Sequence, residues 1–267
     1  MSENTVQSLI DEMIASGVNL PSPPAIAVRI LNAVQQEDQS YTDLAKIISS
    51  DPALTAQMLK IANSGFYSLK YKVTSIEKAL TVLGVNVLKN IALSFVIAKE
   101  MRGSADQKFD FDYFWRRSVT SAVAAELLAI QIGHQNDDTF VTAMLADIGI
   151  LILHQALPEE YQKVFADKKM SAEPISLVEN RLLGTDHCHI GAGLLECWDL
   201  PASICMPIRY HHEPERAPEQ YCRSAEVLQI ADHLSAIYYD PNSGERVRKL
   251  QAELITRYDL TEEKIVE

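Results

Sequence analysis

Apolar residues recur at helical spacing along almost the whole chain, and this periodicity constrains the fold more than any other feature. Leu54, Met58 and Ile61, for example, fall on one face of a segment that begins at Pro52. No stretch of useful length alternates as a β-strand would, and nothing repeats at a fixed period. Glycine and proline number only 10 and 11 among 267 residues. The chain is therefore predicted to be all-α.

Local signals predict where the helices begin and end. Thr42, Asp51 before Pro52, and Ser75 are expected as N-terminal caps, and Gly65 as a residue just past a helix end. The segment LPSPP at 20–24 interrupts the pattern because proline cannot continue a helix. Helices are expected at 6–14, 25–34, 85–101, 111–132, 138–155, 174–183, 187–197, 202–211, 218–239 and 245–256, with a last one after Asp259.

Charge is distributed unevenly and supports a two-lobed organisation. Residues 1–102 carry nine basic and nine acidic side chains, whereas residues 103–267 carry fifteen and twenty-seven and so hold the whole net charge of −12. The polar segment Arg102–Lys108 lies at this change. We therefore expect an N-terminal helical lobe over 1–102 and a second over 103–267. The acidic second lobe would repel DNA or RNA.

The four cysteines and the absence of export signals predict a cytoplasmic protein. Cys188, Cys197, Cys205 and Cys222 form no C-x-x-C pair, and a chain of this length can build a core without disulfides. No apolar run is expected to approach the roughly 18 residues of a membrane span. The N-terminus lacks the layout of a signal peptide. The sequence thus predicts reduced thiols and no membrane partner.

Candidate metal ligands gather in the second lobe. The tripeptide His187-Cys188-His189 and the pair His211-His212 lie near predicted helix ends, while Asp147 and Asp232 interrupt apolar helical runs. A buried acid is costly without a partner. Two such acids with several imidazoles form a ligand set suited to a divalent metal. The alternative is that each acid caps a helix or pairs with an arginine. His134 and His154 are expected at the surface or at a helix end.

The second lobe resembles the HD superfamily of metal-dependent phosphohydrolases, and residues 18–240 are similar to its HDOD branch, the HD-related output domain of bacterial signalling. The resemblance is carried by LPSPPAIAVRILNAV, DPALTAQMLKIANS and ALTVLG in the first part, and by AMLADIGILIL, DHCHIGAGLLECWDLP, IRYHHEP and LQIADHLS in the second. It implies an N-terminal helical bundle packed on a degenerate HD core. It also implies a non-catalytic signalling module that binds a protein or a small ligand.

The resemblance places the superfamily's ligand positions on Arg117, on the Ala146-Asp147 pair and on Asp232. The related HD-GYP enzymes add histidines that fall on His187, His211 and His212, beside Glu213, but their G-Y-P tripeptide is replaced by PERAPE. Arginine and alanine offer no lone pair to a metal. No cofactor is therefore required, although the surviving positions leave ligands for one iron, manganese, zinc or nickel ion: Asp147, His187, His211, His212 and Asp232.

Arg117 and Glu213 are expected to line the old active-site cleft. The guanidinium of Arg117 is predicted to replace the lost metal as the partner of Asp147 or Asp232, since arginine can bridge carboxylates. The alternative is an ordinary surface arginine. An active phosphohydrolase that acts on a nucleotide or cyclic dinucleotide is the second functional hypothesis.

A basic segment in the first lobe is a candidate binding surface. Residues 60–102 carry seven basic side chains against Glu77 and Glu100, with Phe66, Tyr67 and Tyr71 among them. Such a surface suits an unknown signalling protein, or an acidic ligand such as a nucleotide or small anion. The alternative is a solvated lysine-rich face.

Overall fold

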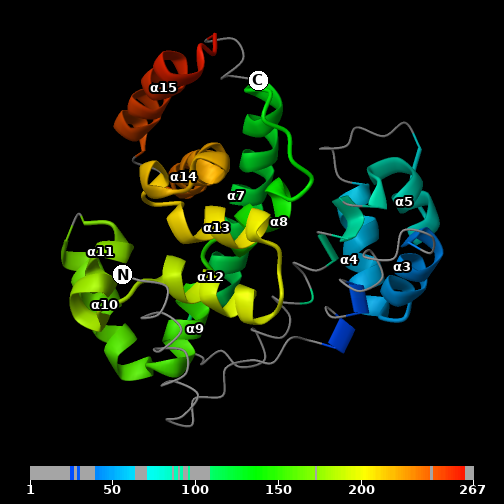
Figure 1. Ribbon diagram of the computed structural model, residues 1–267, viewed down its shortest axis with the longest axis horizontal. Helices are drawn as coiled ribbons and strands as arrows, with labels where there is room; N and C mark the ends of the chain where they lie inside the picture. The colour runs from blue at the N-terminus through cyan, green and yellow to red at the C-terminus, as the bar shows by residue number, and fades with distance from the viewer. Residues whose placement is uncertain are drawn as a thin grey trace. The chain divides into compact units, whose positions relative to one another are not determined.

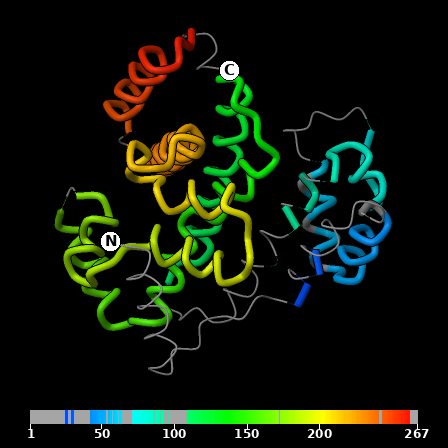
Figure 2. The backbone as a smooth tube through the Cα atoms, in the orientation of Figure 1, coloured from blue at the N-terminus to red at the C-terminus, as the bar shows by residue number. Residues whose placement is uncertain are grey.

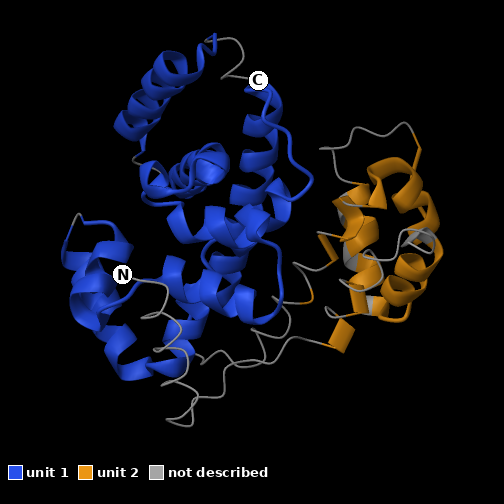
Figure 3. Ribbon diagram, viewed as in Figure 1, with its two compact units in different colours: residues 1–20, 105–267 blue, residues 21–104 orange. Residues whose placement is uncertain are grey.

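The structure is a computed structural model that describes residues 25–26, 29–30, 40–63, 71–85, 87–89, 91–92, 96, 109–171, 173–240 and 243–261. The chain divides into two compact units, residues 21–104 and residues 105–267 with 1–20 (Figure 3). Throughout the described ranges every regular element is a helix, which confirms the all-α class. The boundary expected at residues 102–103 stays a prediction, because the residues around it lie outside those ranges.

The smaller unit contains three described helices that pack on one another: α3 (Ser40–Ser49), α4 (Pro52–Ala62) and α5 (Ile76–Leu83). The caps at Asp51 and Ser75 are confirmed, since the amide of Leu54 donates to Asp51 Oδ1 at 3.1 Å and the amide of Lys78 donates to Ser75 Oγ at 3.3 Å. The cap at Thr42 is wrong, because α3 begins two residues earlier. Gly65 and the helix expected at 6–14 lie outside the described residues, as does most of 25–34 and 85–101.

Asn63, just after α4, joins two separate parts of the smaller unit. Its Nδ2 donates to the carbonyl of Val73 and its Oδ1 accepts from the amide of Val73, both at 2.8 Å. We expect Asn63→Ala to lower the free energy of unfolding by about 1–2 kcal/mol, since Val73 is buried and loses both partners. Urea denaturation measures this. Lys60→Ala, at an exposed position of α4, is the control, and equal loss in the two variants would contradict the prediction.

The larger unit holds the remaining described helices (Figures 1 and 2): α7 (Phe111–Gln131), α8 (Thr139–Leu145), α9 (Ile148–Ala156), α10 (Pro158–Met170), α11 (Ile175–Leu183), α12 (His187–Cys197), α13 (Ala202–Tyr210), the 3-10 turn η2 (Pro214–Arg216), α14 (Glu219–Tyr238) and α15 (Gly244–Tyr258). Helix α7 packs on α8 and α14, and α12 packs on α9 and α13. Helix α13 also packs on α14, so these helices enclose a continuous core.

Two differences from the expected helices matter for function. The single helix predicted over 138–155 is two helices that are separated at Ala146 and Asp147, so Asp147 stands at the start of α9. Helix α10 was not expected, because its charged sequence shows little apolar periodicity; only Tyr161 and Val164 are fully buried on it. Tyr161 nevertheless contributes to the site described below.

The segment Thr139–Ala156 is apolar enough to approach the length of a membrane span, which no run of the sequence was expected to do. Its 18 residues have a mean hydropathy of 1.5, which is sufficient by length and composition for a membrane-crossing helix. However, 83% of the segment is buried inside the protein, and it is divided into α8 and α9. A core helix of a globular domain meets the same criterion, so the segment is weak evidence for a membrane span.

Helices α9 and α12 meet through their backbones. A Cβ on Gly149 would lie 2.0 Å from the carbonyl oxygen of His187, and one on Gly191 would lie 3.0 Å from the amide nitrogen of Gly149. Only glycine permits this approach without displacing one helix. The contact brings the start of α12 directly against the start of α9, and so brings His187 close to Asp147.

Candidate functional site

Five segments of the larger unit bring titratable side chains together in its interior. They are the first half of α7, the break between α8 and α9, the first turn of α12, the end of α13 and the second half of α14. They contribute Arg117, Asp147, His187, Cys188, His211, His212 and Asp232. All the residues predicted as metal ligands therefore lie in or next to one cluster.

The cluster has a histidine half, made of His187, Cys188, His211 and His212, and an arginine half, made of Arg117 and Asp232. Asp147 lies between the two halves and faces each with a different oxygen. Its Oδ1 lies 3.5 Å from His187 Nε2 and 3.7 Å from His211 Nε2. Its Oδ2 lies 3.9 Å from a terminal nitrogen of Arg117. Burial raises the pKa of Asp147, but interaction with His211 and the charge of Arg117 outweigh it and hold the pKa far below its usual range. The carboxylate is therefore ionised.

Arg117 links the two acids on the side away from the histidines. Its terminal nitrogen donates to Asp232 Oδ1 and its Nε donates to Ser235 Oγ at 3.3 Å. Burial lowers the pKa of Arg117, while the charges of Asp232 and Asp147 raise it further, so the net shift is upward. Arg117 was predicted to pair with Asp147 or Asp232; it binds Asp232 and also lies in ion-pair range of Asp147, so the surface-arginine alternative is wrong.

His187 is held by a carboxylate that the sequence analysis did not single out. Glu179 of α11 is fully buried, and its Oε2 accepts from the His187 amide at 2.9 Å and from His187 Nδ1 at 2.6 Å. Its Oε1 accepts from the hydroxyl of Tyr161. This pairing leaves His187 Nε2 directed at the cluster. Glu179 was not predicted as a site residue, because an acid in an amphipathic helix is normally solvated.

His211 and His212 complete the histidine half. His211 Nδ1 lies 2.7 Å from the carbonyl oxygen of Ile208, which can only accept, so Nδ1 carries the proton. His211 Nε2 is buried and has no hydrogen-bond partner; Asp147 Oδ1 lies in ion-pair range, beyond hydrogen-bond length. His212 Nε2 lies 3.2 Å from His187 Nε2. The three imidazoles thus direct Nε2 atoms toward a common point.

The three histidines differ in their tendency to take up a proton. Burial lowers the pKa of His187, but charge interactions with Cys188 and Glu179 outweigh it and raise the pKa well above its usual value. For His211, burial is outweighed by Cys188 and Asp147, and the pKa again rises. Burial and the neighbouring imidazoles hold the pKa of His212 well below its usual value. The cluster therefore favours a positive charge at its centre.

Cys188 is a second residue that the sequence analysis did not count among the ligands. Its side chain is buried, and its Sγ lies 3.6 Å from His187 Nε2. The donor atoms of four residues all lie within 4.8 Å of one another: His187, Cys188, His211 and His212. The available signal was its place between two histidines in the HCH tripeptide.

Several candidates lie elsewhere. Glu213 pairs with Arg216, with both side chains about half exposed, so it does not line the cluster as expected. His189 pairs with Asp186 at 2.8 Å. His154 lies in the last turn of α9, which is one of the two positions expected for it, and its ring is buried among aromatic side chains.

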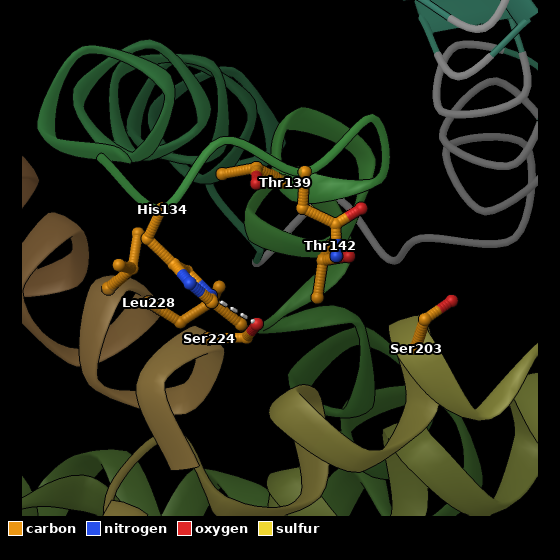
Figure 4. A pocket seen from close by; sticks show the side chains of 8 residues that line it. His134, Thr139, Thr142, Ser203, Ser224 and Leu228 are labelled. Carbon is orange, nitrogen blue, oxygen red and sulfur yellow. Dashed lines mark hydrogen bonds between the residues drawn. The ribbon is translucent and has the colours of Figure 1, made fainter. Parts of the chain in front are cut away.

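A separate pocket lies near the end of α7. Its empty volume, open solvent included, is about 220 Å³, and His134 donates to or accepts from Ser224 Oγ at 3.0 Å in its wall (Figure 4). Its lining is His134, Asn136, Thr139, Thr142, Ser203, Ser224, Val227 and Leu228. The enclosed part of this space has room for about one water molecule, so a nucleotide would not be enclosed here.

The basic segment of the first lobe is described only in part. Phe66, Tyr67, Lys70, Lys99 and Arg102 lie outside the described residues. Of those described, Tyr71 is 85% exposed, and Lys60, Lys72 and Lys78 are exposed too. The binding surface expected there stays a prediction.

An all-helical domain in which acids and imidazoles meet between five helices defines a class related to the HD phosphohydrolases. A family model for the HDOD domain matches residues 20–214. The chain therefore belongs to the HDOD family, and the resemblance found in the sequence is confirmed.

Similar proteins agree with this assignment. A structure of an HDOD domain protein of unknown function from Geobacter sulfurreducens is 28% identical with a TM-score of 0.75, covering 87% of this chain and 78% of that one. A predicted phosphohydrolase from Shewanella amazonensis SB2B is 25% identical with a TM-score of 0.75, covering 91% and 87%. An uncharacterized protein of Treponema pallidum (strain Nichols) is 25% identical over 205 residues, which are 76% of this chain and 39% of that protein. The chain thus spans about two fifths of that relative's length.

The residues present fit one metal ion in the histidine half. The buried, unpartnered Nε2 of His211 is the observation that supports this, because such an atom is costly without a partner. Nε2 atoms of His187 and His212 and Oδ1 of Asp147 lie beside it. A bound ion would supply Lewis-acid character at this point. In the other half, Arg117 stands against Asp147 and Asp232 and offers no lone pair.

Proposed function

We propose that this chain is a non-catalytic signalling module of the HDOD family, which acts by binding a protein or a small ligand. Phosphoester hydrolysis on HD scaffolds draws on a metal-activated water, and usually on a second metal that stabilises the leaving oxygen. The observation that supports the proposal is the position of Arg117, whose guanidinium contacts both Asp147 and Asp232. The guanidinium of Arg117 thus takes the place of a metal ion that would take part in hydrolysis.

Hydrolysis assays test the proposal. The purified chain, stripped with a chelator and reloaded in turn with manganese, iron, zinc and nickel, is offered bis(p-nitrophenyl) phosphate and cyclic dinucleotides. We expect no turnover above that of the same metal in buffer. Turnover that a chelator abolishes and that Asp147→Ala removes would overturn the proposal.

The second candidate, an active phosphohydrolase, is favoured by the histidine half of the cluster. Three buried or partly buried imidazoles beside an ionised aspartate are more than a purely structural domain requires. The likeness to a predicted phosphohydrolase points the same way. The assays above separate the two, because only this candidate predicts turnover.

The partner is proposed from chemistry alone. The acidic larger unit disfavours nucleic acid, and an unknown signalling protein, a nucleotide or a small anion remains. The four cysteines are free, which suits the cytoplasm. Thermal unfolding across a panel of nucleotides distinguishes a ligand sensor from a protein-binding module, because a ligand that binds the native state alone raises the unfolding temperature.

A further inference from the structure

We propose that Cys188 is a metal ligand and that, with His187, His211 and His212, it forms a closed four-donor site for zinc. The inference refines the proposed function, since it says what the histidine half does once hydrolysis is lost. It concerns a residue of this chain that neither the HD pattern nor the predicted ligand set includes.

The position of the thiol supports a role as ligand. Cys188 is 3% exposed, and its Sγ lies 3.6 Å from His187 Nε2, while His212 Nε2 lies 3.2 Å from that same atom. Four donors bound to one zinc at the usual bond lengths are separated by about 3.3–3.8 Å. All pairs here lie within 4.8 Å, so modest side-chain movements would close the set around an ion.

The imidazoles are oriented as metal ligands are. The Nδ1 of His187 pairs with Glu179 and that of His211 with the carbonyl of Ile208, at 2.6 and 2.7 Å. Metal-bound histidines typically donate their other ring nitrogen to a carboxylate or a backbone carbonyl. Both rings therefore present a lone pair at Nε2 in the neutral state, and the Nε2 of His211 has nothing else to bond.

The thiol also decides which metal is favoured. A thiolate is a soft ligand that favours zinc over manganese or magnesium, and a site of three nitrogens and one sulfur suits tetrahedral zinc. With four protein donors, no coordination position remains for water or substrate. Such a site is structural, which agrees with a domain that has lost catalysis.

Metal analysis and cobalt spectroscopy of the full chain test the inference. We expect about one zinc per chain after purification under reducing conditions without a chelator. We also expect that cobalt added to the metal-free chain gives tetrahedral visible bands and a thiolate-to-cobalt charge-transfer band in the near ultraviolet. This band reports sulfur ligation without reference to any activity.

Two cysteine variants complete the experiment. Cys188→Ser should remove the charge-transfer band and weaken zinc binding by more than about 100-fold. Cys197→Ser, at an exposed position on the same helix, should change neither. A wild-type cobalt protein without the band, or equal bands in the two variants, would overturn the inference, as would a chain that binds no zinc. None of these outcomes affects the absence of hydrolysis, so the two proposals fail separately.

Discussion

Gly149→Ala will abolish the stable packing of α9 on α12. The new methyl group would lie 2.0 Å from the carbonyl oxygen of His187 and 2.7–2.8 Å from its carbonyl carbon and Cα. These are backbone atoms, which cannot rotate away as a side chain does. Overpacking of a core commonly costs about 1–3 kcal/mol, and we expect at least about 3 kcal/mol here because a helix must shift.

Urea denaturation followed by circular dichroism measures this loss. Gly244→Ala, at the start of α15, is the matched control, since a methyl group there has no atom within 4 Å; we expect it to stay within about 0.5 kcal/mol of the wild type. If Gly149→Ala were as stable as the control, the backbone contact would not exist as described.

Arg117→Met will be the second strongly destabilising change. It keeps much of the side-chain volume but leaves Asp147 and Asp232, each 12–13% exposed in its side chain, without their shared cation. Removing one partner of a buried ion pair typically costs about 3–5 kcal/mol, because the remaining charge is uncompensated. We expect a loss in this range, measured by urea denaturation in the presence of a chelator.

Two further variants show whether the loss comes from charge. Arg116→Met alters an exposed neighbour that contacts only its own helix in the described hydrogen bonds, and we expect a change within about 0.5 kcal/mol. Adding Asp232→Asn to Arg117→Met should restore part of the loss, since one uncompensated charge is removed. A double variant less stable than Arg117→Met would count against an electrostatic origin.

Much of the fold could be predicted because its helices have regular apolar faces. The helices expected at 187–197 and 202–211 agree with α12 and α13 to within one residue. The helix predicted over 138–155 is interrupted at Asp147. This break was not predicted, because periodicity does not detect a local break inside a continuous apolar run. Helix α10 was missed for the opposite reason, since few of its residues are buried.

The residue types of the site and its Arg117 ion pair were predictable, but its other contacts were not. Position-by-position resemblance indicated Arg117 and the surviving acids, and the predicted pairing is present. Glu179 could not be assigned a role from sequence, and Cys188 offered only its place in the HCH tripeptide, because the importance of both depends on what the tertiary fold places beside them. Glu213 was predicted in the cleft but lies outside the cluster: although it follows two clustered histidines in sequence, its side chain pairs with Arg216 at the surface.

The shared position of Asp147 has a thermodynamic consequence. One of its oxygens faces the imidazoles and the other faces Arg117, so an anion that displaces Asp147 from the guanidinium would leave this carboxylate free to interact more strongly with a cation among the imidazoles. Linkage requires that each then changes the affinity of the other by the same factor. Occupancy of one half would be communicated to the other through a single side chain, without any displacement of the helices.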